Sequence, residues 1–237
     1  MNFLKISSAV LLLAVAIAVP RASACSDGSM NGVVGFLVGS AVGHFTADGA
    51  GHITAGSLTV SNGGVISNKT FTGTYSIATN CIGTLTLNYI GGGKVDANFV
   101  FDNGNKGAQI IDADIGTLAS GFSLAQGTVT CGLGPKRTFA ANLLGKNSVG
   151  HVAYVAQVIL NGTGGVSGSG TFDVNGTITV ATITGTYTEN SHCTGSLKIT
   201  PKGLSALNFN FVVVNAGSEM FLVETDTNAV VAGYMQQ

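Results

Sequence analysis

Charged residues are scarce in this sequence. Asp, Glu, Lys and Arg make up 9% of its 237 residues, whereas roughly 25% is usual in a soluble domain. With so few basic residues the chain has little means of holding a polyanion, so we expect no nucleic-acid partner. The low charge does not indicate disorder, because apolar residues at 45% are enough for a hydrophobic core.

The sequence also lacks the motifs of common catalytic and metal-binding sites. It has no HExxH or H-x-H pattern, no G-x-S-x-G turn and no C-x-x-C pair. The glycine-rich stretches 91–93 and 162–165 lie between predicted strands and open no helix, so they do not resemble phosphate loops. His44 and His52 flank a turn, but strand alternation places them on opposite faces. We expect no catalytic residue that a motif would reveal, no metal and no cofactor.

Only one long apolar run occurs, and it lies at the N-terminus. Residues 9–19 are uniformly apolar, follow Lys5 and precede Ala22-Ser23-Ala24. This pattern is typical of a cleaved secretory signal, and the run is too short to span a bilayer. We predict a signal peptide at 1–24 and a secreted, periplasmic or cell-surface protein. A lipoprotein anchored through Cys25 is the less favoured alternative, because Ala22 stands where such signals prefer Leu.

The remaining chain contains an internal repeat. Residues 71–125 align with 183–237 at a constant offset of 112, with 14 identities in 55 positions. Upstream, the turn at Asp48-Gly49 matches Asn161-Gly162 at an offset of 113. We therefore predict a first β repeat at 25–127 and a second at 128–237.

The four cysteines follow the same repeat. Each half has one cysteine near its start and one after a T-G-T-Y segment. Four cysteines allow three pairings, and only Cys25–Cys81 with Cys131–Cys193 preserves the symmetry of the repeat. We predict these two disulfides, which require an oxidising compartment.

Hydrophobic side chains alternate with polar ones, as expected for strands with one buried face. Val95, Ala97, Phe99 and Phe101 show this period, and turn signals such as Asn103-Gly104 recur about every ten residues. We predict an all-β fold of seven or eight strands per half. Two tandem antiparallel up-and-down barrels, similar to lipocalin or avidin barrels, hide all strand edges and are preferred. Two β-sandwiches are the second choice, and one large shared barrel is the third.

The repeat resembles a pattern found in exported bacterial proteins of unassigned function. The shared elements are T-G-T-Y at 72–75 and 184–187, C-x-G-x-L at 81–85 and 193–197, and N-F at 98–99 and 210–211. This resemblance implies export and a β fold. It implies no active site.

A few polar residues recur at equivalent positions and are candidates for ligand binding. Two acidic pairs, Asp112 with Asp114 and Glu224 with Asp226, each share a strand face. They suggest a calcium site or a polar barrel mouth, although acidic strand ends that cap turns are more common. Tyr75 and Tyr187 are equivalent aromatic candidates, for which a structural hydrogen bond is the usual role.

The favoured function is a non-catalytic binding or surface-structural module. Its partner would be a small apolar ligand held in a barrel, or a cell-surface component. A barrel-type cyclase or isomerase is one alternative, since such an enzyme needs only a shaped pocket and one or two polar groups. An outer-membrane barrel is another, but the sequence lacks aromatic girdles.

Overall fold

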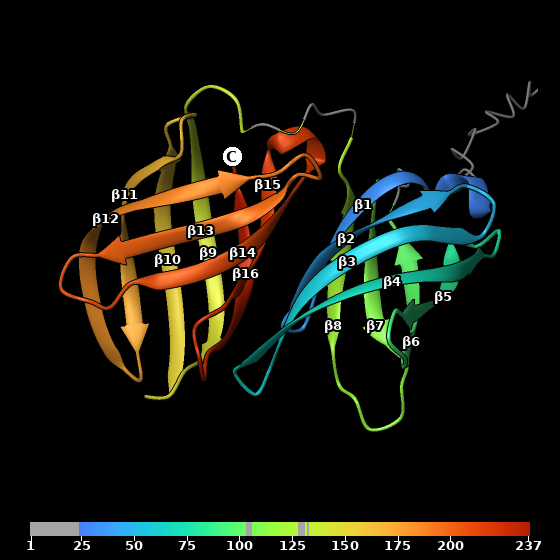
Figure 1. Ribbon diagram of the computed structural model, residues 1–237, viewed down its shortest axis with the longest axis horizontal. Coiled ribbons are helices and arrows are strands. Elements are labelled where there is room, and N and C mark those ends of the chain that lie inside the picture. The colour runs from blue at the N-terminus through green and yellow to red at the C-terminus, as the bar shows by residue number, and fades with distance from the viewer. Residues whose placement is uncertain (1–23, 103–105, 128–130, 132) are drawn as a thin grey trace, which may run out of the picture.

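The computed structural model describes residues 24–102, 106–127, 131 and 133–237 of the chain. Two closed antiparallel barrels follow one another, and in each of them eight strands pair in sequence order (Figure 1). This confirms the predicted tandem up-and-down barrels. Residues 1–23 of the predicted signal peptide lie outside the described residues. In the described part of the chain, no helix has the length and apolar character needed to cross a membrane.

The first barrel begins after a short 3-10 helix, η1 (Asp27–Ser29), and closes where β1 pairs with β8. Its strands are β1 (Asn31–Val38), β2 (Ala41–Asp48), β3 (His52–Asn62), β4 (Val65–Ile77), β5 (Ile82–Tyr89), β6 (Lys94–Phe101), β7 (Gly107–Asp112) and β8 (Ser120–Ala125).

The second barrel closes where β16 pairs with β9, and a 3-10 helix, η2 (Asn215–Gly217), joins β14 to β15. Its strands are β9 (Arg137–Lys146), β10 (His151–Leu160), β11 (Gly165–Val174), β12 (Thr177–Glu189), β13 (Thr194–Pro201), β14 (Leu207–Val214), β15 (Glu219–Glu224) and β16 (Val230–Gln236).

The predicted alternation determines which side chains enter the barrels. Along β6, Ala97 and Phe99 are buried while Asn98 and Val100 are exposed. Each barrel thereby encloses its own hydrophobic core. The barrel interiors are apolar because successive side chains of a strand point to opposite sides of the sheet.

A bulge in β3 explains the change of repeat offset. Thr46 pairs with Ala55 but Ala47 pairs with Ile53, so β3 contains one extra residue, whereas β10 and β11 pair without a shift. Because of this extra residue, the offset between aligned residues of the two repeats is 113 before the bulge and 112 after it.

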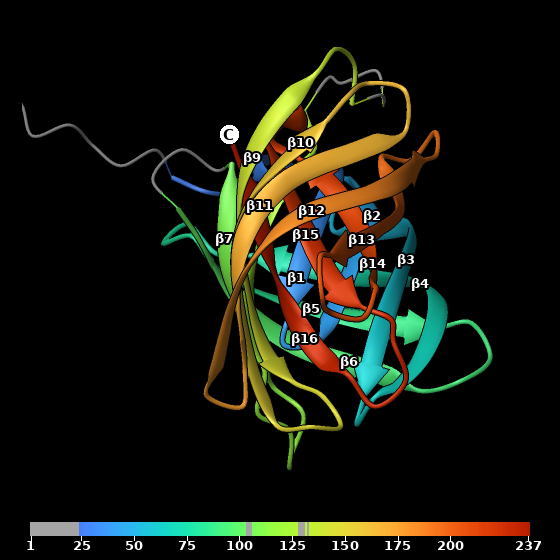
Figure 2. The same ribbon diagram turned by 90° about the vertical axis from the view of Figure 1, so that its left-hand side faces the viewer.

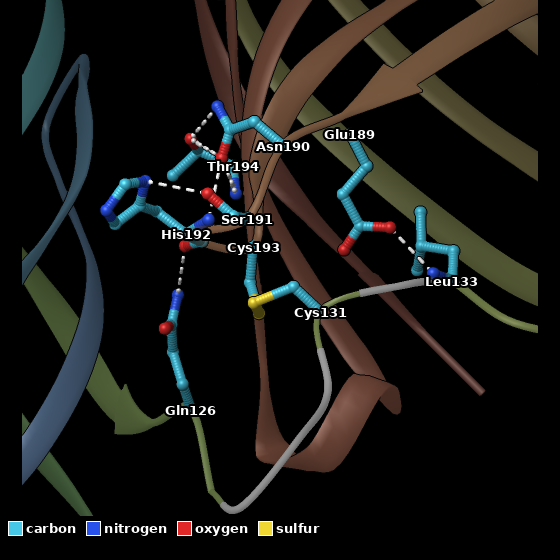
Figure 3. Close-up of a disulfide and its surroundings, with 9 residues drawn as sticks. All are labelled: Gln126, Cys131, Leu133, Glu189, Asn190, Ser191, His192, Cys193 and Thr194. Carbon is cyan, nitrogen blue, oxygen red and sulfur yellow. Dashed lines mark hydrogen bonds between the residues drawn. A yellow bond between two sulfur atoms is a disulfide. The ribbon is translucent and has the colours of Figure 1, made fainter.

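Both predicted disulfides are present, Cys25–Cys81 and Cys131–Cys193. Each ties the segment that precedes the first strand of a barrel to a turn at the end of that barrel. Figure 3 shows the second one, beside which the Leu133 backbone N–H donates to the Glu189 carboxylate over 2.6 Å. The two bridges indicate an oxidising, extracytoplasmic environment.

The barrels pack side by side through their outer walls (Figure 1). A third hydrophobic cluster joins Leu37 and Val42 of the first barrel to residues of β14 and β15 in the second. The rings of Phe122 and Phe221 meet edge to face with centroids 4.8 Å apart. The Ser61 hydroxyl also donates to the Ala229 carbonyl over 2.6 Å across the buried contact. These contacts make the two barrels one packed unit.

Candidate functional site

The first barrel contains a cavity of about 670 Å³. It opens at the end where the β1–β2 and β7–β8 connections lie, because residues of both connections line it together with Asn62 and Tyr89, the last residues of β3 and β5. Its wall is mostly apolar. The apolar lining residues on strands are Phe36, Val38, Ala41, Phe45, Leu58, Val60, Leu85, Leu87, Val95, Ala97 and Ile110. A cavity of this size and character suits a small apolar molecule.

The cavity exists because small residues stand where the second barrel has large ones. Ala97 pairs with Leu85 and Asp112, and Phe209 pairs with the equivalent Leu197 and Glu224. Phe209 is 1% exposed and belongs to the hydrophobic core of its barrel. Phenylalanine occupies space in the second barrel that alanine leaves open in the first.

The same substitution pattern recurs on β2 and β3. Ala41 pairs with Val60 in the first barrel, and Tyr154 pairs with Phe172 at the equivalent place in the second. The rings of Tyr154 and Phe172 contact each other with centroids 5.4 Å apart. The two barrels therefore share a backbone plan but differ in how their interiors are filled.

The other end of the first barrel is closed. Tyr75 is 5% exposed, and its hydroxyl donates to the backbone carbonyls of Asp27 and Met30 over 3.1 and 2.7 Å. The Asp27 carboxylate in turn accepts the Ile77 backbone N–H over 2.7 Å. These bonds hold η1 across the barrel end, beside the Cys25–Cys81 bridge, and a ligand must enter from the opposite side.

Three ionisable side chains line the cavity near its mouth: Lys69 on β4, Tyr89 on β5 and Asp112 on β7. Burial, together with the nearby Asp112 and Asp114 carboxylates, raises the pKa of Tyr89, so its phenol remains a hydrogen-bond donor. Within the described residues Lys69 forms no ion pair. The mouth thus offers an ammonium, a phenol and a carboxylate to the polar end of a ligand.

The sequence suggested six residues as ligand contacts, and the structure places them in different parts of the two barrels. Asp112 lines the cavity, and Asp114 lies just beyond it, where its backbone N–H donates to the Asp112 carboxylate over 2.9 Å. Tyr75 lies at the closed end of the barrel. Tyr187, Glu224 and Asp226 belong to the filled second barrel. Ligand binding by Asp112 stays a prediction.

Sequence reasoning missed Lys69, Tyr89 and Ala97. No motif marks them, but the repeat alignment contained a usable signal, because Ala97 aligns with Phe209. Where one repeat has alanine at an inward position and the other repeat has phenylalanine at the aligned position, the repeat with alanine is expected to contain an empty volume.

The histidines form no metal site in the described ranges, where no three His, Cys, Asp or Glu side chains converge. His52 contacts Asp48 through Nδ1 at 2.8 Å. His44 instead stacks on His192 of the second barrel, with ring centroids 5.7 Å apart. Burial and the neighbouring His192 lower the pKa of His44.

A second hollow of about 620 Å³ lies between the barrels. Hydroxyl and amide groups dominate it, including Thr59, whose hydroxyl accepts from the Asn210 side chain over 2.9 Å. Such a lining is suited to water and neutral polar groups.

Glu224 is the buried counterpart of Asp112. It is 2% exposed, and its Oε2 has no hydrogen-bond partner in the described part of the chain. Burial, the Asp226 charge and a hydrogen bond to Asp226 raise the pKa of Glu224 to about 7. The Asp226 carboxylate also accepts the backbone and side-chain N–H groups of Asn208 over 2.9 and 2.6 Å. The protonated Glu224 therefore serves as a donor to an already oriented carboxylate.

This arrangement predicts a pH-dependent stability. An unfolded glutamate loses its proton near 4.5, whereas Glu224 in the folded protein loses it near 7. The folded state binds the proton more tightly, so stability falls as the pH rises through this window, by about 3 kcal/mol in total. Glu224→Gln stays neutral and keeps a donor for Asp226. We expect it to unfold in urea like the wild type at pH 4 but to be more stable by about 3 kcal/mol at pH 8.5. Equal effects at both pH values would contradict the assignment.

No protein-family model matches the chain, and a search of curated proteins finds no significantly similar relative. The cavity is therefore the feature of the molecule from which a function can be inferred.

Proposed function

We propose that the protein is an exported, disulfide-stabilised binding module whose first barrel takes up one small, mostly apolar molecule. The observation that carries this proposal is the open, apolar cavity of about 670 Å³ in a barrel whose neighbour, built on the same plan, is filled. Evenly packed interiors are the rule in proteins, so an unfilled volume beside a filled equivalent suggests a ligand site.

Export to a secreted, periplasmic or cell-surface location is part of the proposal. The two disulfides and the N-terminal segment support it together. The burial pattern supports a ligand-binding barrel over a membrane-spanning one. Inward residues such as Phe71, Leu85 and Phe99 are apolar, whereas a channel-type membrane barrel has a polar interior.

The proposal can be tested by filling the cavity with phenylalanine at position 97, the residue that the second barrel has at the equivalent position. We expect wild-type protein to bind the neutral fluorophore N-phenyl-1-naphthylamine once per chain, with enhanced emission; the chain has no tryptophan to interfere. Ala97→Phe should weaken this binding by at least about tenfold, because the ring occupies the ligand volume. Fluorescence titration measures both affinities.

The matched control is Val100→Phe, which adds a ring on the outer face of the same strand, where Val100 is 43% exposed. It should bind the fluorophore like the wild type. Absence of saturable binding to the wild type, or equal affinity in Ala97→Phe, would refute the proposal.

A further inference from the structure

The mouth of the cavity is surrounded by exposed aliphatic side chains. Val65, Ile115 and Leu118 are 71%, 103% and 99% exposed. Val65 begins β4 next to the β3–β4 turn, and Ile115 and Leu118 lie on the β7–β8 connection, from which Leu118 also lines the cavity. We call these three residues the apolar rim. Isolated exposed aliphatic residues are ordinary, but three at the entrance of one apolar cavity form a functional feature.

The second barrel extends this feature. Val149 in the β9–β10 turn and Ile178 after the β11–β12 turn are 64% and 68% exposed. In Figures 1 and 2 these two turns reach the lower edge of the molecule, as do the β3–β4 hairpin and the β7–β8 loop. Because the barrels are packed together, the aliphatic tips of both can meet one flat surface at the same time.

The turns that form this edge carry little charge. Among residues 62–66, 113–119, 147–150 and 175–178, Asp114 is the one ionisable residue, and its carboxylate accepts the Asp96 backbone N–H over 3.3 Å. Lys69 and Asp112 at the mouth carry opposite charges, and Lys146 directly precedes the β9–β10 turn. Because charges of both signs are present, the edge has little net attraction for an anionic membrane, whereas neutral lipid headgroups impose no electrostatic requirement.

The position of the rim also favours lipid. An apolar ligand is concentrated in membranes, and the cavity has its opening at the rim while the opposite end is closed by η1 and Tyr75. Aliphatic side chains on separate loop tips suit shallow insertion into a bilayer interface better than a packed protein contact, whose centre is normally contiguous and aromatic-rich.

We propose that the apolar rim docks on the surface of a neutral lipid bilayer, so that the ligand passes between bilayer and cavity without crossing bulk water. This inference rests on the proposed function of the cavity. It adds the source of the ligand and the face through which the ligand is exchanged.

Flotation with phosphatidylcholine vesicles tests the docking. We expect the wild type to float with the vesicles. The double variant Val65→Ser/Ile115→Ser, called the loop variant, changes two rim residues that do not line the cavity, and it should partition about tenfold less because two apolar tips are lost. The matched control Val155→Ser/Val180→Ser removes comparably exposed aliphatic residues, 53% and 78%, from the wall of the second barrel. It should float like the wild type.

Transfer kinetics separate this proposal from the cavity proposal. The loop variant should bind N-phenyl-1-naphthylamine in vesicle-free buffer like the wild type. Ala97→Phe should lose the fluorophore yet still float. For the wild type, the rate of fluorophore transfer to vesicles should rise with vesicle concentration, as contact-mediated exchange requires.

Four results would overturn the docking proposal. These are failure of the wild type to float, flotation of the loop variant at the wild-type level, binding that needs anionic phosphatidylglycerol, and a transfer rate independent of vesicle concentration. A rim that instead joins two copies of the chain would appear in sedimentation as a dimer that the loop variant abolishes, and this too would overturn it.

Discussion

Replacing Phe209 by alanine should destabilise the second barrel by about 3–5 kcal/mol, the usual cost of removing a buried phenylalanine ring. Phe209 is 1% exposed and lies among other fully buried side chains, including Phe211 and Met220. The closed sheet has limited freedom to collapse onto the missing ring, because each strand is held by two neighbours. Urea unfolding followed by far-ultraviolet circular dichroism measures the loss.

The same variant should create a binding site. The ring that is removed occupies the place of Ala97 in the first barrel, and an enclosed apolar cavity can take up an apolar molecule. We expect N-phenyl-1-naphthylamine to bind Phe209→Ala at two sites per chain. Phe209→Leu, which leaves a smaller space, should cost about 1 kcal/mol and retain one site. A loss below about 1 kcal/mol for the alanine variant would contradict the role of Phe209 in filling the barrel.

Removing the Cys131–Cys193 bridge should have an effect of similar size. The bridge closes a loop of 62 residues, and the chain-entropy relation then gives about 4 kcal/mol of stabilisation. The segment that it anchors enters β9, the strand that closes the second barrel against β16. We expect Cys131→Ala/Cys193→Ala to lose this amount in urea unfolding.

The first barrel provides the control for the disulfide variant. Its own bridge, Cys25–Cys81, and its cavity are unchanged, so fluorophore binding should persist at urea concentrations that leave this barrel folded. Detection of free thiols at these two positions in the wild type, or a loss below about 1 kcal/mol, would contradict the prediction.

The barrel fold and the disulfides could be predicted because both depend on patterns local to the chain. Hydrophobic side chains recur at every second residue along β6 and β14, which predicts strands. Turn residues such as Asn175-Gly176 predict where the hairpins lie. The repeat then selects one pairing of four cysteines. The two residues Gly39 and Ser40 separate β1 from β2. Gly39 has a φ of 55° there, which few other residues tolerate.

The candidate site was harder to predict because its main feature is an empty volume inside the first barrel. Asp112 was marked by its recurrence as Glu224, yet one faces an open cavity and the other is buried with a raised pKa. The difference comes from Ala97, Ala41 and Val60, whose smallness has meaning only beside the residues that surround them. Tyr75 and Tyr187 recur equally well, but the Tyr75 hydroxyl is used to close a barrel end.

Composition, period and repeat by themselves determined that this chain forms two antiparallel β units with one disulfide inside each, and they favoured barrels, because alternation and pairing symmetry are properties of residue order. Only the tertiary structure decided that one barrel contains an open cavity, that large side chains fill the equivalent space in the other, and that the aliphatic tips of separate loops lie on one edge. Those features arise where side chains that are distant in sequence either fill a common space or leave it empty. Whether filling that space stabilises the fold depends on all the side chains around it.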